Sequence, residues 1–307
     1  MTLHAQGIAI RDGQKVAFLG DSITRQGWDN PGGYVRLVVA GLAAEGIHIA
    51  PIPAGVSGDT SKEMLHRLDD DVLSQKPDWL LVSCGVNDVW HGANGVALPL
   101  YGERMTSIID ETMAKGIRVL ILTATGIGED TNPYNQALAP YNDFLRTLAQ
   151  HEGCPLADVN AAFQSALKAN PPPPGTFLLT IDGVHLNPAG NRLMAREILR
   201  ALGVPEADFP KIEAAWATLP GTASVSAGLK GTLIQLNLGQ YQALEVKAAK
   251  EKTNVNGLTE KWYLETLRTI LKTHANDPAP NPAQIEAEAQ QQFAQRITEA
   301  VKADTNP

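Results

Sequence analysis

Cysteine pairs and long apolar runs are both missing from this chain. Only Cys84 and Cys154 are cysteines among the 307 residues, too few for a disulfide framework. No apolar run approaches the ~20 residues that a membrane-spanning helix needs. The sequence also lacks an HExxH motif, a phosphate-binding P-loop and a GxGxxG motif. We therefore predict neither a bound metal ion nor an organic cofactor.

The N-terminus has no long apolar core, so no intact signal peptide is predicted. The stretch Leu3-His4-Ala5-Gln6 is compatible with the remnant of one, because small residues precede export cleavage sites. The compartment stays open, with export to the periplasm or medium as one alternative. A composition of 44% hydrophobic and 19% charged residues is typical of a soluble globular protein. A net charge of −8 argues against a nucleic-acid partner for the whole chain.

Apolar runs alternate with segments of helical periodicity from residue 16 to about 203. This alternation predicts parallel strands joined by helices, in a three-layer α/β/α domain. Ligands of such open sheets bind at the carboxyl ends of the strands. The predicted strands are 16–19, 48–52, 79–84, 117–123 and 155–159, and the predicted helices are 34–44, 61–73, 98–115, 137–151 and 188–202.

The chain changes character after Pro210. We predict a catalytic domain over 1–210, a Gly-, Ser- and Ala-rich linker over 211–231 and a mainly helical extension over 232–307. The extension begins with a short predicted strand at 232–237, and helices are predicted at 240–252, 258–272 and 283–302.

Ser22 follows the first predicted strand, in the block Gly20-Asp21-Ser22-Ile23-Thr24. Glycine permits a tight turn at the ligand-binding edge of the sheet, and the turn leaves the serine hydroxyl beside the next helix. The alternative is that Ser22 only caps this helix, which is a common role of serine.

A serine nucleophile needs a base within hydrogen-bonding reach and a group that orients the base. Asp182 and His185 lie three residues apart before the last predicted helix of the domain. On a turn, this spacing lets the carboxylate meet one imidazole nitrogen while the other faces Ser22. The alternative is a turn-forming aspartate and a histidine at a helix N-terminus.

Acyl transfer also needs hydrogen-bond donors for the oxyanion. Gly58 can present an unobstructed backbone N–H after the second strand, and Asn87 can present a side-chain amide after the third. A capping turn and an Asn-Asp turn are the structural alternatives. To reject a catalytic role, each of these structural alternatives would have to be true at the same edge of the sheet. A serine hydrolase explains all of these residues at once, so we favour it.

Four blocks in this order resemble the SGNH hydrolases, also called the GDSL esterase and lipase family. The resemblance spans roughly residues 14–203. It implies a flavodoxin-like α/β/α fold with five parallel strands and no metal or cofactor. The matching positions are Gly20 to Thr24, Gly58 within Ser-Gly-Asp-Thr-Ser, Gly85 to Asp88, and Asp182 to His185.

The resemblance also implies a role for each matching residue. Ser22 would be the nucleophile, His185 the base and Asp182 the residue that orients it. The oxyanion hole would consist of the Ser22 and Gly58 backbone amides and the Asn87 side chain.

Residues within these blocks or shortly after them are candidates for substrate binding. Aromatic side chains suit the faces of sugar rings as well as aryl or acyl groups, although the two tryptophans also fit a packing role. The candidates are Asp21, Trp28, Asp88, Trp90, His91 and Val184.

The predicted function is hydrolysis of short-acyl esters, and the resemblance suggests a carbohydrate acetylesterase. A lipase or thioesterase for longer acyl chains is the alternative. The lack of an apolar lid helix in the sequence argues against it. A binding protein that keeps a hydrolase fold without turnover is the alternative from another class.

Residues 232–271 resemble the ribbon-helix-helix fold, which forms intertwined dimers and often binds DNA. Seven basic and four acidic residues over 230–272 give a net charge of only +3, which a solvated helix face also explains. We therefore predict no nucleic-acid partner. The extension is instead expected to pack on the catalytic domain or to form a homodimer contact.

Overall fold

A computed structural model describes four stretches of the chain, 7–173, 176–227, 232–274 and 281–302. Leu3–Gln6, the predicted export remnant, lies outside them. The chain divides into two units, Met1–Trp216 and Ala217–Pro307. No helix among the described residues is long and apolar enough to cross a membrane.

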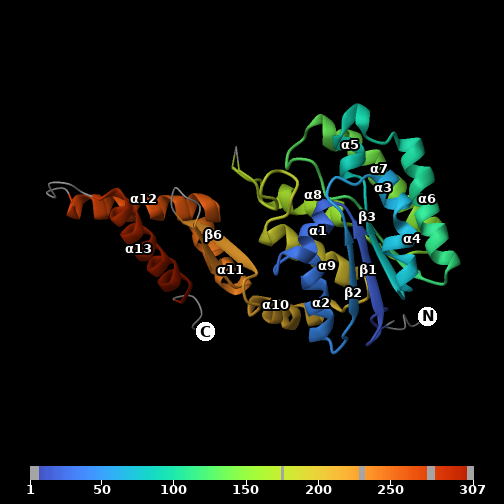
Figure 1. Cartoon of the computed structure of the whole chain (residues 1–307), viewed down its shortest axis with the longest axis horizontal. Coiled ribbons are helices and arrows are strands. Elements are labelled where there is room, and N and C mark those ends of the chain that lie inside the picture. The colour runs from blue at the N-terminus through green and yellow to red at the C-terminus, as the bar shows by residue number, and fades with distance from the viewer. Residues whose placement is uncertain (1–6, 174–175, 228–231, 275–280, 303–307) are drawn as a thin grey trace. The chain divides into compact units, whose positions relative to one another are not determined.

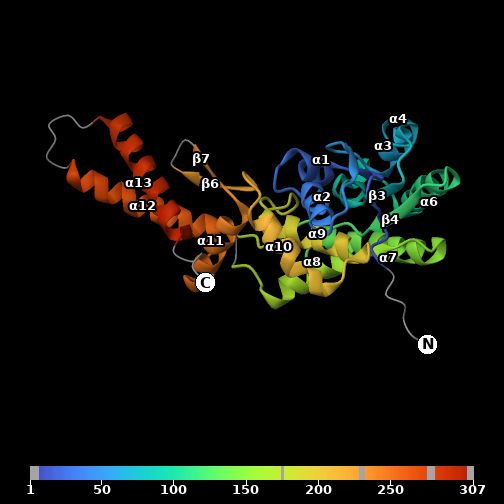
Figure 2. The same cartoon turned by 90° about the horizontal axis from the view of Figure 1, so that it is seen from below.

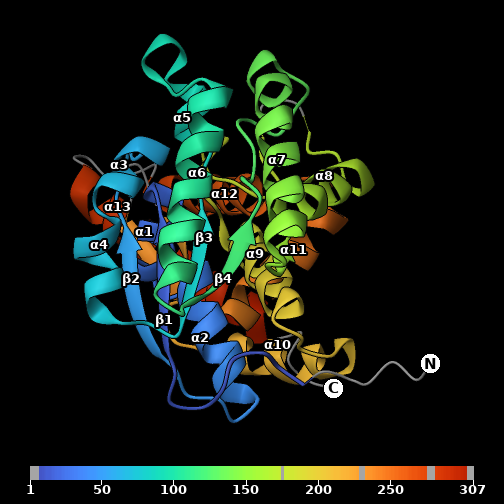
Figure 3. The same ribbon diagram turned by 90° about the vertical axis from the view of Figure 1, so that its right-hand side faces the viewer.

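Five parallel strands form the sheet of the first unit, in the order β2-β1-β3-β4-β5 (Figures 1 and 3). The inner strands are almost wholly buried, as their continuous apolar runs predict. The predicted α/β/α fold with a five-stranded parallel sheet is confirmed. The strands are β1 (Lys15–Gly20), β2 (Ala50–Gly55), β3 (Trp79–Ser83), β4 (Arg118–Leu122) and β5 (Leu156–Ala157).

Helices cover both faces of this sheet. α2, α8 and α9 pack together on one face, and α3, α6 and α7 pack on the other (Figures 2 and 3). The helices are α1 (Ser22–Asp29), α2 (Tyr34–Ala44), α3 (Ser61–His66), α4 (Leu68–Asp71), α5 (Val86–Trp90), α6 (Leu98–Ala114), α7 (Pro133–Glu152), α8 (Val159–Ala169), α9 (Pro188–Ala201) and α10 (Phe209–Ala217).

The strand order reverses between β1 and β3, because the chain adds β2 on one side of β1 and then β3 on the other. Loops leaving the carboxyl ends of two such strands turn to opposite faces and leave a crevice between them. Ser22 follows β1 and Asn87 follows β3, so both lie at the position where this class of sheet binds its ligands.

Two predicted elements of the first unit differ from the structure. The helix predicted over 61–73 is interrupted, and it is replaced by α3, α4 and a 3-10 turn at Leu73–Gln75. The strand predicted over 155–159 ends at Ala157. The Asp158 side chain then accepts a hydrogen bond from the Ala161 N–H and caps α8, a helix that the periodicity did not reveal.

The predicted linker over 211–231 contains regular structure. Helix α10 buries Phe209, Ile212 and Trp216, and the Trp216 Nε1–H donates to the Leu37 carbonyl at 2.8 Å. Each such side chain contributes about 1.5–3 kcal/mol on burial. This packing anchors α10 to the first unit, so the boundary falls after residue 216 rather than 210.

The second unit is an antiparallel hairpin followed by three helices (Figure 1). Helices α12 and α13 lie side by side (Figure 2). The elements are β6 (Ala223–Ala227), β7 (Thr232–Leu236), α11 (Leu238–Lys250), α12 (Val255–Thr273) and α13 (Pro282–Lys302).

This unit has a hydrophobic core of its own, in which the Tyr263 and Phe293 rings meet edge to face at 5.7 Å. The ribbon-helix-helix resemblance covers β7, α11 and α12 but omits β6 and α13. One edge of β7 pairs with β6 of the same chain, a partner strand that the ribbon-helix-helix resemblance does not include.

Candidate active site

Ser22 is the first residue of α1, directly beyond the end of β1. The Asp21 side chain caps the helix by accepting the Ile23 N–H at 2.9 Å. A Cβ atom at Gly20 would lie 2.0 Å from Thr24 Oγ1, so only glycine fits where β1 turns into α1. The cap is therefore Asp21, and the Ser22 side chain is left for another role.

Asp182 and His185 lie on a turn before α9. One Asp182 oxygen, Oδ1, accepts the backbone N–H groups of Val184 and His185 at 3.0 and 2.8 Å. The other oxygen lies 2.7 Å from His185 Nδ1. Partial burial alone would raise the pKa of Asp182, but these hydrogen bonds hold it below its usual value. The carboxylate is thus kept ionised beside the imidazole.

The second imidazole nitrogen, Nε2 of His185, lies 3.0 Å from Ser22 Oγ. With the Nδ1 proton directed at Asp182, the Nε2 lone pair faces the serine hydroxyl. The His185 side chain is 23% exposed and that of Asp182 49%, so the arrangement opens to solvent. Serine, histidine and aspartate in this sequence of contacts can carry out nucleophilic acyl transfer.

Gly58 and Asn87 offer donors at the same edge of the sheet as the serine. Gly58 has a φ of +88°, a left-handed conformation that side chains disfavour, and nothing lies within 4 Å of where its Cβ would be. Within the described residues, neither its N–H nor that of Ser22 donates a hydrogen bond. The Asn87 amide uses one hydrogen on the Asp59 carbonyl at 3.0 Å, which leaves its second hydrogen available.

Arg67 ties these donors to the sheet, although no motif points to it. Its guanidinium donates to Asp59 Oδ2 at 2.6 Å and to the carbonyls of Gly20 and Ala54 at 3.0 and 2.9 Å. These groups lie at the ends of β1 and β2 and in the turn that contains Gly58. Its side chain is 14% exposed, so Arg67 is a largely buried brace beneath the site.

Three of the six predicted substrate-binding residues turn inward. Asp21, Asp88 and Val184 are each at most 3% exposed. Asp88 accepts the N–H and hydroxyl of Ser61, which fixes the start of α3. These side chains therefore face the protein interior, and their role in substrate binding stays a prediction; the position of a residue in a catalytic block does not determine where its side chain points.

His91 lines a hollow of about 270 Å³ that Gly58 also lines. Trp28 and Trp90 do not line it: the Arg36 guanidinium stacks on Trp28, 3.7 Å from the ring centroid, and Trp90 is 40% exposed. The lining is mostly polar and consists of Gly58, Thr60, Lys62, Glu63, His91, Asn94, Gly95, Val96, Leu100 and Arg104.

The described residues contain no group of three His, Cys, Asp or Glu side chains placed to hold a metal ion. Cys84 is buried and near Asp88, and burial raises its thiol pKa well above the usual value. It is therefore a poor nucleophile, and Ser22 is the side chain with a base in contact.

The fold and these contacts define a serine hydrolase, and comparison with known proteins agrees. The model of the GDSL-like lipase/acylhydrolase family matches residues 18–193, and the chain belongs to this family. It is a carboxylic ester hydrolase, as predicted. The match ends before the second unit begins.

The relatives include acetylxylan esterases. An acetylxylan esterase of Geobacillus stearothermophilus is 32% identical over an alignment of 216 residues that covers 63% of this chain and 96% of that protein. The crystal structure of an acetylxylan esterase from the same organism has a TM-score of 0.57 at 29% identity, covering 64% of this chain and 97% of that one. The acetyl xylan esterase AlAXEase has a TM-score of 0.57 at 34% identity, with 61% and 98% covered. Catalytic variants of the Geobacillus enzyme, also solved, replace a serine, an aspartate or a histidine by alanine.

Proposed function

We propose that this chain removes acetyl groups from carbohydrate, with Ser22 as nucleophile, His185 as general base and Asp182 as the residue that orients it. The observation that carries the proposal is the continuous path of hydrogen bonds from Asp182 through His185 to Ser22, at 2.7 and 3.0 Å. It ends at the ligand-binding edge of the sheet, beside a polar hollow.

In the first half of the reaction, Ser22 Oγ attacks the carbonyl carbon of the ester as His185 Nε2 takes the hydroxyl proton. The carbonyl π electrons move onto oxygen and form a tetrahedral oxyanion. The carbon–oxygen bond to the sugar then breaks, and His185 returns its proton to the leaving sugar hydroxyl. Asp182 stabilises the imidazolium without itself being protonated.

The oxyanion would be held by the N–H groups of Ser22 and Gly58 and by the second amide hydrogen of Asn87. These donors are fixed before substrate arrives: Ser22 by the start of α1, and Gly58 and Asn87 through the Asp59 contacts described above. Donors that need no reorganisation stabilise the transition state more than the ground state.

In the second half, water attacks the acetyl group on Ser22 while His185 takes a proton from the water. Collapse of the second oxyanion breaks the bond to Oγ, and the proton returns from His185 to Ser22 as acetate leaves. The exposure of Asp182 and His185 gives water access to the acyl-enzyme.

The hollow beside Gly58 favours a carbohydrate over a long acyl chain. Of its lining residues, only Val96 and Leu100 are large and apolar, whereas Lys62, Glu63, Asn94 and Arg104 offer polar groups. Sugar hydroxyls can exchange hydrogen bonds with such groups, but a fatty acyl chain would bury them unsatisfied. The acetylxylan esterase relatives point to the same class of substrate.

The test is hydrolysis of p-nitrophenyl esters from acetate to decanoate, together with acetate release from acetylated xylo-oligosaccharides. We expect activity on acetate, a steep decline with chain length, and loss of activity in Ser22→Ala. A preference for long chains would favour a lipase or thioesterase. If the wild type turned over none of these esters, a binding function would take precedence.

We further propose that the second unit supports a homodimer and does not bind nucleic acid. Leu264 and Leu271 are seven residues apart on α12, and their side chains are 40% and 48% exposed. Light scattering of the intact chain and of a chain ending at Thr218 tests the dimer. If the intact chain and the shortened chain contained equal numbers of protomers, the dimer proposal would be rejected. Salt-sensitive retention of duplex DNA by the intact chain would reject the proposal that the second unit does not bind nucleic acid.

A further inference from the structure

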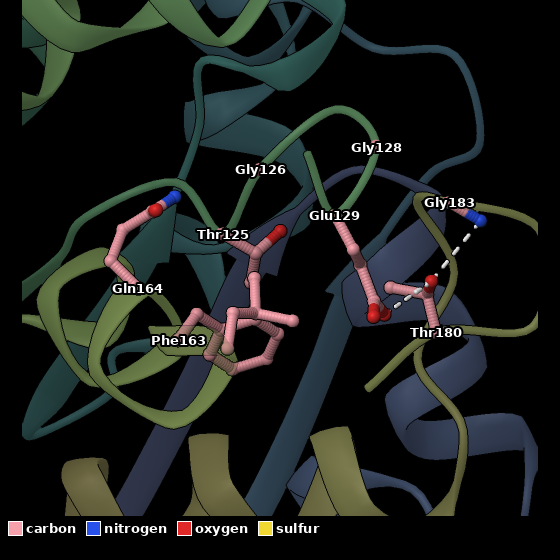
Figure 4. A pocket seen from close by; sticks show the side chains of 9 residues that line it. Thr125, Gly126, Gly128, Glu129, Phe163, Gln164, Thr180 and Gly183 are labelled. Carbon is pink, nitrogen blue, oxygen red and sulfur yellow. Dashed lines mark hydrogen bonds between the residues drawn. The ribbon is translucent and has the colours of Figure 1, made fainter. Parts of the chain in front are cut away.

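Glu129 lies in the loop that leaves β4, at the same edge of the sheet as Ser22 and Asn87. Its carboxylate accepts hydrogen bonds from the backbone N–H groups of Leu178 and Leu179, at 2.5 and 2.8 Å. It also accepts the Thr180 hydroxyl at 2.7 Å. Figure 4 shows Glu129 reaching from its own loop across to Thr180. All three donors belong to the segment that leads into the Asp182 turn.

Thr180 passes this contact on to the turn itself. Its Oγ1 donates to Glu129 and accepts the Gly183 N–H at 3.1 Å (Figure 4). The Gly183 carbonyl accepts the Gly128 N–H at 2.7 Å. Gly183 is the residue next to Asp182, and the loop that carries Glu129 therefore holds both of its backbone polar groups. Its N–H is held through Thr180, and its carbonyl is held directly by Gly128.

The rest of the turn is a short hairpin. Thr180 and Leu186 form an antiparallel bridge, and the Ile181 N–H donates to the His185 carbonyl at 2.8 Å. Movement at Thr180 is therefore transmitted to both Asp182 and His185. Leu179 and Thr180 are 4% and 6% exposed, so bulk water does not replace the Glu129 contacts.

We propose that Glu129 is a positioning residue of the hydrolase, which sets the distance between His185 Nε2 and Ser22 Oγ by fixing the 178–183 segment. The proposal rests on the roles proposed above for Ser22, Asp182 and His185. Glu129 makes no hydrogen bond to these three side chains and acts through the Thr180 hydroxyl and the backbone of the turn. Small misplacements of a catalytic group can cost up to about 10²-fold in rate.

The carboxylate chemistry of Glu129 makes the proposal specific. Two oxygens with four lone pairs can accept all three donors at once. A glutamine has one oxygen, and its NH₂ group would face a Leu178 or Leu179 N–H. Glu129→Gln therefore keeps the size of the side chain and breaks at least one contact. Thr180→Val keeps the shape of Thr180 and removes the hydroxyl that bridges Glu129 to Gly183.

The experiment measures kcat, KM and the pH profile of kcat/KM for p-nitrophenyl acetate in the full-length chain. For Glu129→Gln we expect kcat to fall by about 10- to 100-fold with KM within about twofold of wild type. The pH profile of kcat/KM should also differ from that of wild type, because the loosened turn alters the contact between Asp182 and His185. Glu129→Asp, which keeps the charge, should recover part of kcat.

Glu111→Gln on α6 is the matched control, since it makes the same change at an exposed side chain, and its kinetics should equal those of wild type. Thr180→Val should lower kcat in the same way, and the double variant should lose less than the product of the two single losses. This arm keeps the test decisive if Glu129→Gln fails to fold.

Ser22→Ala separates the two proposals. If Ser22→Ala is inactive but Glu129→Gln and Thr180→Val keep the wild-type kcat and pH profile, the positioning role is overturned and the proposed function stands. A lowered melting temperature with unchanged kinetics overturns it too, because Glu129 would then act on stability alone. Retained activity in Ser22→Ala overturns the proposed function and this inference with it.

Discussion

His185 Nε2 accepts a hydrogen bond from Ser22 Oγ at 3.0 Å, although 163 positions separate the two residues in the chain. Ser22 is fixed by the start of α1, whereas His185 is fixed by a turn before α9. The parallel sheet brings them together. β1 and β4 end at the same edge of the sheet, and the loop after β4 is hydrogen-bonded to the turn that carries His185.

Asp182→Asn should lower kcat by roughly 10³- to 10⁴-fold while the protein remains folded. An asparagine Oδ1 can still accept the Val184 and His185 N–H groups, so the turn should persist. Its NH₂ group, however, would face His185 Nδ1 and favour the tautomer that carries its proton on Nε2, which cannot accept from Ser22. The measurement is kcat for p-nitrophenyl acetate, with Asp143→Asn on α7 as an exposed control. A kcat within tenfold of wild type would contradict the role of Asp182.

Asn87→Ala should reduce kcat by about 10²- to 10³-fold and change KM little, because the lost donor acts on charge that develops in the transition state. Asn170→Ala is the matched control. Asn170 is exposed at the end of α8 and is not among the proposed oxyanion donors, so its kcat should stay within about threefold of wild type. Equal kcat values in the two variants would remove Asn87 from the oxyanion hole.

The sequence was sufficient to predict the sheet and the three side chains that touch one another at the site. Runs such as 79–84 are apolar throughout because the strand is buried on both faces, and this pattern needs no knowledge of the neighbours. Ser22, Asp182 and His185 stand out because each lies in a short block with its own turn chemistry. The fold then supplies the contact that the blocks imply.

Glu129 and Arg67 could not be predicted in this way, because most of their partners are backbone groups. A Leu178 N–H or a Gly20 carbonyl leaves no mark in the sequence. The directions of the Asp21 and Asp88 side chains were also hidden, since both residues lie within catalytic blocks and yet are buried. The rule that ligands bind at the carboxyl ends of strands, applied to β4 as well, would have directed attention to the loop that contains Glu129.

Arg67→Lys should lower both stability and kcat. A lysine ammonium is a point charge and cannot reach Asp59 and the Gly20 and Ala54 carbonyls together. We expect the free energy of unfolding to fall by about 3 kcal/mol, as for other broken buried pairs. Urea denaturation measures it, with Arg25→Lys as the control. Arg25 pairs with Asp29 on the surface, and its change should cost under about 1 kcal/mol. Similar losses in the two variants would contradict the role of Arg67 as a buried brace.

Asp21→Asn should stabilise the protein at neutral pH and much less at pH 4. Burial raises the pKa of Asp21 to about 6, and the nearby Asp88 charge adds to the rise. The hydrogen bond from the Ile23 N–H lowers this pKa but does not cancel the effect of burial. Between the ordinary value of 3.8 and about 6, the folded chain holds a proton that the unfolded chain has lost. Wild-type stability therefore falls as pH rises through this window, by up to about 3 kcal/mol. Asparagine stays neutral and can still accept the Ile23 N–H, so it avoids this loss.

Urea denaturation of both proteins at each pH from 4 to 8 should show a stability difference that grows up to about pH 7 and is then constant. Asp70→Asn on α4 removes an exposed charge and serves as the control. Parallel stability curves for wild type and Asp21→Asn would mean that Asp21 is ionised in the folded protein throughout this range.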